Sequence, residues 1–227
     1  MIGWLASLAS LLSCQIQELP WWLVMVGILI RTQLHTGLFI IGHDAMHVVL
    51  LPASRRWNDR LGALVLALYA ALPYRTCRDS HWRHHRFSAT ALDPDFASST
   101  RVSALGWYCQ FMARYLCWRQ MAGLLTLWSA MALAFSSVIN VLLFCTLPLL
   151  LSSLQLFVFG TYLPHRRQRD PQNHSPDSLN FPTWLSLLAC FHFGYHREHH
   201  ENPGLAWHEL PEAKSSPRPL AASWWAM

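Results

Sequence analysis

From Gln120 to His165 the chain contains no Asp, Glu, Lys or Arg. A helix that crosses a bilayer core needs about 20 predominantly apolar residues, so this stretch is long enough to cross a membrane twice. Asn140 and Pro148 lie near its middle, where we expect a tight turn or a kink. The alternative is a buried helical hairpin of a soluble protein, which the length of the run disfavours. The stretch therefore predicts an integral membrane protein.

The composition of the whole chain agrees with a membrane protein. Apolar residues make up 53% of the 227 residues and charged residues 13%, whereas charged residues are about a quarter of a soluble domain. Twelve tryptophans, many near the ends of apolar runs, fit anchoring at the membrane interface. The length predicts one domain, which we place at residues 1–211. Residues 212–227 are rich in Pro and Ser and are expected to be a disordered tail.

The pattern of apolar segments predicts an all-α fold with about four transmembrane helices. Residues 1–17 and 21–47 each form one apolar segment, and the charge-free stretch adds two more crossings. Residues 61–74 are too short to cross and predict a re-entrant or interfacial helix. Residues 104–118 mix aromatic residues with Arg114, which is typical of an interfacial helix. We expect a helical region on the cytoplasmic side to cap the four crossings.

The arginines indicate which side of the membrane is cytoplasmic. Arginine-rich segments near the ends of membrane helices stay in the cytoplasm. A nucleic-acid surface is the alternative, but these arginines flank apolar spans and do not form one continuous stripe. The arginines in question are Arg55, Arg56, Arg60, Arg75, Arg78, Arg83, Arg86, Arg166, Arg167, Arg169 and Arg197.

The six cysteines show no C-x-x-C pairing, so we expect them to be reduced and to act as small apolar residues.

Eight of the thirteen histidines fall in three short clusters beside these arginines. The clusters are His43-Asp44-Ala45-Met46-His47, His81-Trp82-Arg83-His84-His85 and His196-Arg197-Glu198-His199-His200. Positions i, i+3 and i+4 of a helix share one face, so we expect each cluster to aim its imidazoles toward one point. Eight ligands are too many for one tetrahedral zinc. They suit two metal ions, and nitrogen-rich sites with open positions favour iron that handles dioxygen.

Polar residues also occur deeper in the second apolar segment. Arg31 and His35 lie on the same helical stripe as His43 and His47, and polar side chains at that depth face the bundle interior or a cavity. We expect His35 to be a hydrogen-bonded buried histidine rather than a metal ligand.

One H-x-x-x-H and two H-x-x-H-H boxes around a membrane hairpin resemble the membrane fatty-acid desaturase and hydroxylase superfamily. The residues beside the boxes are more closely similar to the bacterial-type β-carotene ketolases, and the resemblance covers residues 20–211. The segments that carry it are Gly37-Leu38-Phe39, Asn58-Asp59, Asp93-Pro94-Asp95-Phe96, Phe159-Gly160-Thr161-Tyr162-Leu163-Pro164-His165-Arg166, Trp184-Leu185-Ser186-Leu187-Leu188 and Phe191-His192-Phe193-Gly194-Tyr195-His196.

The resemblance implies a di-iron centre held by about nine histidines, one more than the boxes supply. His165 matches the place of the additional ligand, because it lies just where the hairpin re-emerges from the membrane. His192 is the competitor, since it precedes His196 by one helical turn. The implied ligand set is His43, His47, His81, His84, His85, His165, His196, His199 and His200.

Four carboxylates near the boxes could accept the second N–H of a metal-bound imidazole and so fix its orientation. They are Asp44, Asp93, Asp95 and Glu198. Asp93 and Asp95 flank Pro94 and could instead shape a turn.

The chemistry that the resemblance implies is oxygenation of the C4 methylene of a β-ionone ring, with two Fe²⁺ ions as cofactor and O2 as co-substrate. Two successive hydroxylations at C4 give a geminal diol, which loses water to leave a ketone, as in echinenone and canthaxanthin. The carotenoid comes from the bilayer lipids. The electrons come from an external donor such as ferredoxin with its reductase, because the chain has no haem, flavin or iron–sulfur motif.

Three other functions remain open at this point. A carotenoid ring hydroxylase or an acyl-lipid desaturase would carry the same boxes. A membrane metal-binding or transport protein could also use histidine clusters, but that function predicts charged or polar residues along several spans. The stretch from Gln120 to His165 has no Asp, Glu, Lys or Arg.

Overall fold

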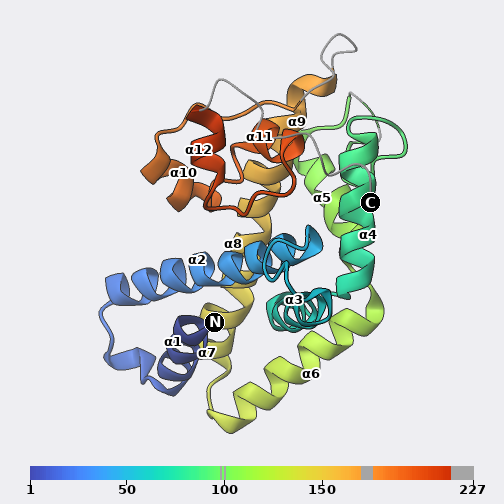
Figure 1. Cartoon of the computed structure of the whole chain (residues 1–227). Helices are drawn as coiled ribbons and strands as arrows, with labels where there is room; N and C mark the ends of the chain where they lie inside the picture. Colours follow the sequence, from blue (N-terminus) through green and yellow to red (C-terminus); the bar gives the residue numbers. More distant parts are fainter. Residues whose placement is uncertain (98, 100, 170–175, 216–227) are drawn as a thin grey trace.

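The computed structural model describes the chain except residues 98, 100, 170–175 and 216–227, and the described part is helical without a strand (Figure 1). The predicted all-α class is therefore confirmed. The separate helices are α1 (Ile2–Ser13), α2 (Trp21–Met46), α3 (Arg55–Ala70), α4 (Tyr74–Phe87), α5 (Ala104–Tyr115), α6 (Trp118–Ala134), α10 (Thr183–Cys190), α11 (His196–Glu201) and α12 (Leu210–Ser215). One long helix runs through α7 (Val138–Val141), η2 (Leu142–Thr146), α8 (Leu147–Leu156), η3 (Phe157–Tyr162) and α9 (Leu163–His165).

Two of the described helices are long and apolar enough to cross a membrane: Trp21–Met46 and Val138–His165. With 12 residues α1 is shorter than a span requires, and α6 has 17. Crossing by these two helices stays a prediction. The outer faces of the long helices and of α6 nevertheless expose apolar side chains suited to lipid, among them Leu29, Ile30, Leu125, Leu133, Leu142 and Leu150.

The charge-free stretch forms a helical hairpin, but its turn is not at the predicted position. The chain reverses between α6 and α7 at residues 135–137, where Ser136 has a φ of 52°. Asn140 lies in the following helix instead, and its amide group donates to the backbone carbonyls of Leu11, Leu12 and Cys14. This asparagine therefore serves to satisfy the carbonyl groups at the end of α1, which would otherwise lack partners.

Pro148 sits inside the long helix and leaves it unbroken. A proline has no N–H, so the carbonyl four residues earlier loses its helical partner. That carbonyl belongs to Phe144, and it accepts a hydrogen bond from Arg31 Nε at 3.1 Å. The preceding turn, η2, widens to a π-helix. Arg31 is 1% exposed and also donates to the carbonyl of Trp4, so this buried cation ties α1, α2 and the long helix together.

The core lies where α2 packs between α3 and α8. Two glycines allow α2 and α3 to approach closely: a Cβ at Gly42 would lie 2.6 Å from Leu66, and one at Gly62 would lie 2.7 Å from Ala45. α3 begins at Arg55, earlier than the predicted start at residue 61, and ends at Ala70, which is followed by Ala71 with a φ of 52°. The C-terminal helices α10–α12 lie on one side of α2 (Figure 1), and Gln33 in the middle of α2 donates to the carbonyl of Leu187 in α10.

The residues after the third histidine box lie partly outside the described structure. α12 extends to Ser215, so the predicted tail begins with helical residues. Residues 216–227 are outside the described residues.

Candidate metal centre

Eight of the nine predicted ligands form two groups of four histidines. We name His43, His47, His81 and His199 the first cluster, and His84, His165, His196 and His200 the second cluster. Within each cluster the possible ligand atoms lie within 4.8 Å of one another. The helices that meet here are α2, α4, α9 and α11, so residues far apart in sequence converge on one region.

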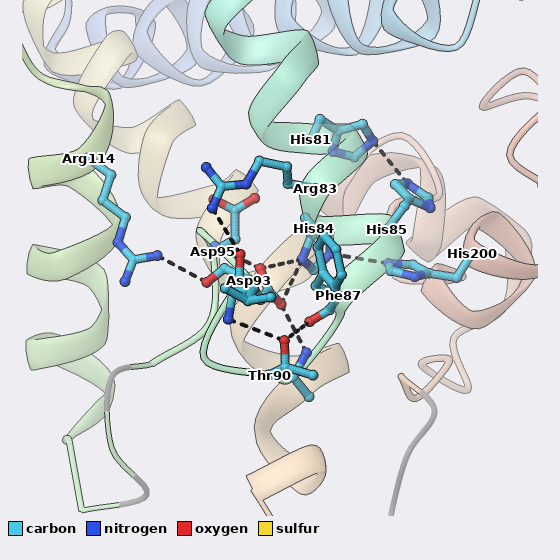
Figure 2. Close-up of polar contacts among 12 residues, drawn as sticks. His81, Arg83, His84, His85, Phe87, Thr90, Asp93, Asp95, Arg114 and His200 are labelled. Atoms are coloured by element: carbon cyan, nitrogen blue, oxygen red, sulfur yellow. Dashed lines mark hydrogen bonds and ion pairs between the residues drawn. The ribbon is translucent and has the colours of Figure 1, made fainter.

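His85 is the ninth histidine and lies at the edge of the first cluster. Its Nε2 is 3.1 Å from Nε2 of His81 and 2.9 Å from Nε2 of His199. Its ring stacks on that of His200 in the second cluster, with centroids 4.2 Å apart. The contacts drawn in Figure 2 show this ring between His81 and His200. The two clusters therefore share one continuous centre.

The spacing of the nitrogen atoms fits a bound metal ion. Imidazole nitrogens bind zinc at about 2.1 Å, and ligand atoms of one ion at that bond length lie roughly 3 Å apart. In the second cluster, Nε2 of His200 lies 3.2 Å from Nε2 of His84 and 3.0 Å from Nε2 of His196. A neutral imidazole has only one N–H, so hydrogen bonding alone does not explain nitrogen atoms that converge in this way.

The expectation that each box aims all its histidines toward one point is wrong. In the second box, His81 and His85 lie at the first cluster while His84 belongs to the second. In the third box, His196 and His200 belong to the second cluster and His199 to the first. Successive residues of a helix are about 100° apart, whereas i and i+4 differ by only about 40°. Each H-x-x-H-H box therefore presents its i and i+4 members to one cluster and its i+3 member to the other.

The structure brings His165 rather than His192 into the centre. The ring of His165 is 4.7 Å from the rings of both His84 and His196. The ring of His192 stacks on Tyr195 at 5.6 Å and on Trp207 at 5.9 Å. The prediction that His192 shares a helix face with His196 is wrong.

The chain leaves the helical conformation between these two histidines. α10 ends at Cys190, and both Phe191 and His192 have positive φ values, of 46° and 65°. α11 then starts afresh at His196.

Among the carboxylates, Asp93 holds a histidine directly. Its two oxygens lie 2.9 and 3.0 Å from Nδ1 of His84 (Figure 2). The same oxygens accept the backbone N–H groups of Asp95 and Ala89. Because Nδ1 of His84 donates to this carboxylate, its Nε2 keeps a lone pair directed at the second cluster.

The other three carboxylates have different partners. Asp44 lies 3.6 Å from Nδ1 of His43, beyond hydrogen-bond distance, and accepts the backbone N–H of Trp207. The Asp95 side chain accepts from the hydroxyl of Tyr115. Glu198 accepts a hydrogen bond from Ser178. The role of these residues toward metal-bound histidines stays a prediction.

Burial keeps most of the box imidazoles neutral. It lowers the pKa values of His47, His81, His85, His196 and His200 well below the ordinary value, and the positive charges of neighbouring histidines lower them further. For His199 burial lowers the pKa to about 3. Burial is the largest influence on His84 and acts to lower its pKa, but the hydrogen bond to Asp93 and the negative charges of Asp93 and Asp95 together outweigh burial and raise the pKa. Neutral imidazole is the form that binds metal.

Three side chains that the sequence did not single out individually fix the end of α2. The Asn58 amide and the Tyr74 hydroxyl both donate to the carbonyl of Ala45 at 2.7 Å. The indole of Trp82 donates to the carbonyl of Met46 at 3.1 Å. The Ala45 carbonyl also accepts the backbone N–H of Val48 at 3.1 Å. The three side-chain bonds add partners at the end of the helix and so position the turn between His43 and His47. The Asn58-Asp59 pair in the sequence was the only signal for this role.

His35, by contrast, is satisfied by protein groups. Its Nδ1 accepts from Trp4 Nε1 at 3.1 Å, and its Nε2 lies 2.6 Å from the carbonyl of Tyr69. It therefore has a structural role, as predicted from its depth in the apolar segment.

An apolar cavity of about 230 Å³ leads to the centre. His43, His81, His84 and His196 line it at the metal centre, and side chains of α6 and α8 line it elsewhere. Met121 on α6 and Leu150 on α8 belong to this lining and are about half exposed, at 48% and 53%. The cavity therefore extends from exposed apolar side chains of α6 and α8 to the histidines.

The sequence is similar to a known family and to several known proteins. A family model described as fatty acid desaturase matches residues 20–116 and 98–224. A β-carotene ketolase of Paracoccus sp. (strain N81106 / MBIC 01143) is 41% identical over 196 residues, covering 85% of this chain and 80% of the relative. A β-carotene ketolase of Paracoccus sp. (strain PC1) is 40% identical over 188 residues, covering 82% and 76%.

A more distant relative spans more of the chain. The zeaxanthin 4-ketolase of Chlamydomonas reinhardtii is 34% identical over 220 residues, which is 90% of this chain and 49% of the relative. No solved structure matches.

Proposed function

The chain belongs to the fatty acid desaturase family, and on that premise we propose that it is a membrane oxygenase that converts C4 of carotenoid β-ionone rings to a ketone. The observation that carries the proposal is the nine-histidine centre at the end of an apolar cavity. The two Paracoccus relatives, which this chain matches over 80% and 76% of their length, carry the name β-carotene ketolase.

The two clusters would each hold one iron ion. His43, His47, His81, His85 and His199 would bind the first, and His84, His165, His196 and His200 the second. Bound iron would supply the activation of O2 that oxidation of an unactivated C–H bond requires. An all-nitrogen donor set suits iron better than calcium or magnesium, which prefer oxygen ligands.

The protein's part in the reaction is to place the ring and to exclude water. The cavity suits one ring end of a carotenoid, so the polyene chain would extend between α6 and α8 toward the bilayer. His43 and His196 lie in the cavity lining, so the ring carbon that enters furthest meets the histidine centre. Most of the lining is apolar, so for an unsubstituted ring shape decides which carbon arrives there.

Each hydroxylation consumes one O2 and two electrons, and two hydroxylations at C4 followed by loss of water give the ketone. We propose that a soluble electron carrier such as ferredoxin, with its reductase, supplies these electrons. Arginines near the boxes support placing the centre on the cytoplasmic face, where such carriers occur: Arg75, Arg83 and Arg86 are exposed on α4.

Expression in a host that makes β-carotene tests the proposal, with pigments separated by chromatography and iron measured in the purified protein. We expect 4-keto products. Unchanged β-carotene in the presence of iron-loaded protein would reject the ketolase function, and a product hydroxylated at C3 would indicate a ring hydroxylase instead. His84→Ala and His199→Ala remove one ligand from each cluster, and each should reduce both iron content and product.

A further inference from the structure

Two side chains of the cavity lining, Asp95 and Thr161, keep a polar oxygen that bonds to none of the described residues, and the proposed reaction gives neither a role. Most polar side chains in its lining are hydrogen-bonded to the protein. The Gln120 amide donates to the carbonyl of Ala70 at 2.6 Å, and the Ser153 hydroxyl lies 2.6 Å from that of Tyr108. These groups offer little to a ligand, because their partners are already in place.

Asp95 is different. It is 8% exposed and lines the cavity together with Tyr115, whose hydroxyl donates to Asp95 Oδ1 at 2.6 Å. The second carboxylate oxygen, Oδ2, makes no hydrogen bond with any described residue. This oxygen is not fully enclosed by protein atoms, so it keeps accessible surface in the cavity. A carboxyl oxygen therefore faces an otherwise apolar space.

A role in orienting a metal ligand does not account for this oxygen. Asp93 already holds Nδ1 of His84 with both of its oxygens. The backbone of Asp95 has a structural role, because its carbonyl accepts from Trp107 Nε1 at 2.8 Å. That bond would form with any residue at position 95. A buried polar oxygen without a partner is unfavourable, so the side chain needs a different explanation.

The position of Asp95 indicates what would bind it. Asp95 lines the cavity, and its N–H donates to the same Asp93 oxygen that holds His84 Nδ1, so Asp95 lies at the metal end. A ring that presents C4 to the histidines holds its neighbouring carbon, C3, at the same end. A hydroxyl on C3 can donate to a carboxylate or accept from a protonated carboxyl, so it satisfies Oδ2 in either state.

We infer that Asp95, held by Tyr115, is a binding site for the C3 hydroxyl, and that it makes this chain favour 3-hydroxylated rings over unsubstituted β-ionone rings. This inference rests on the proposed function and adds a specificity-determining residue to it. A site built to hydrogen-bond a substrate hydroxyl discriminates against the analogue that lacks it, because the polar group then stays unpaired. A hydrogen bond to a charged group corresponds to roughly a tenfold to hundredfold preference.

The test is a competition between zeaxanthin, which carries a hydroxyl on C3 of each ring, and β-carotene in one reaction. Both substrates meet the same centre, so the ratio of their conversion rates is independent of iron loading and electron supply. The double variant Asp95→Leu/Tyr115→Phe replaces both hydrogen-bonding partners with apolar groups, which avoids leaving one of them unpaired. We expect the ratio of zeaxanthin to β-carotene conversion to fall by roughly tenfold to a hundredfold.

A single variant serves as the control. Thr161→Val removes another hydroxyl of the cavity lining at nearly constant volume and should keep the ratio. An unchanged ratio in the double variant, or a fall that follows Thr161 instead, overturns the inference.

A binding measurement separates this inference from the proposed function. Zeaxanthin and β-carotene are titrated into iron-free protein in lipid nanodiscs, with quenching of tryptophan fluorescence as the signal. We expect the unaltered protein to bind zeaxanthin more tightly and the double variant to lose this difference. Equal binding by the unaltered protein rejects the hydroxyl site. Failure of the iron-loaded protein to oxidise either carotenoid rejects the ketolase function, whatever the binding result.

Discussion

Replacement of Asp93 by asparagine tests whether the second cluster depends on the carboxylate that orients it. Asp93 is 3% exposed, and its oxygens accept from His84 Nδ1 and from the backbone N–H groups of Ala89 and Asp95. Asparagine has the same shape but only one acceptor oxygen. Wherever its NH2 group is placed, it faces a backbone N–H that has lost its acceptor.

Two losses of different kind follow from this geometry. Loss of a carboxylate that orients a metal-bound histidine lowers metal affinity by about 10- to 100-fold, or roughly 1.4–2.7 kcal/mol. The unpaired backbone N–H costs a further ~1–3 kcal/mol of folding free energy. We therefore expect Asp93→Asn to weaken iron binding at one of the two sites and to lower the thermal unfolding midpoint.

The assay is anaerobic titration of iron-free protein in nanodiscs with Fe²⁺, in competition with a chelator of known affinity. Asp44→Asn is the matched control, because Asp44 lies 3.6 Å from His43 Nδ1 and makes no hydrogen bond to it. We expect that control to change iron affinity by less than about threefold, since no ligand-orienting bond is lost. If Asp93→Asn folds and binds both iron ions as tightly as the unaltered protein, the reasoning from this hydrogen bond is refuted.

Three further predictions concern the histidines and the end of α2. His85→Ala should reduce the iron content measured by mass spectrometry from two ions toward one. His192→Ala should keep two ions, because the His192 ring packs on aromatic side chains. Equal losses in the two variants would contradict the assignment. Asn58→Leu removes one of two side-chain donors to the Ala45 carbonyl and takes away the acceptor of the Leu51 N–H. It should destabilise the protein by ~1–3 kcal/mol, seen as a lower thermal midpoint. In the folded protein the pKa of His199 is lowered to about 3, whereas in the unfolded chain it is about 6.5. Between these values the unfolded chain binds more protons than the folded protein, so the stability of iron-free protein falls as the pH falls. A thermal midpoint of iron-free protein that rises on acidification would contradict this sign.

The helices were predictable where the apolar pattern was long. The span over residues 21–47 agrees with α2 to within one residue, because hydrophobicity over that length is a local property of the chain. The turn of the hairpin was misplaced because Asn140 and Pro148 were interpreted as local breakers. Both residues form hydrogen bonds with groups that are distant in sequence instead. The Asn140 amide donates to a carbonyl at the end of α1, and Arg31 donates to the Phe144 carbonyl that Pro148 leaves without a helical partner.

The sequence by itself determined the kind of centre. Imidazoles at spacings of three and four, next to apolar spans, predict clustered metal ligands whatever the tertiary arrangement, because these spacings place side chains on neighbouring parts of one helix face. The match of His165 to a ninth position also came from sequence, through the resemblance to the desaturase superfamily.

Only the tertiary structure decided how the histidines divide between two clusters. Whether His84 and His85 serve one ion or two depends on how α4 is rotated against α2 and α11, and no local pattern records that angle. The same holds for Asp93 and Asp95, which look alike in sequence. One of them contacts His84 and the other contacts Tyr115, because the packing of α4 and α5 around their loop turns the two carboxylates toward different neighbours.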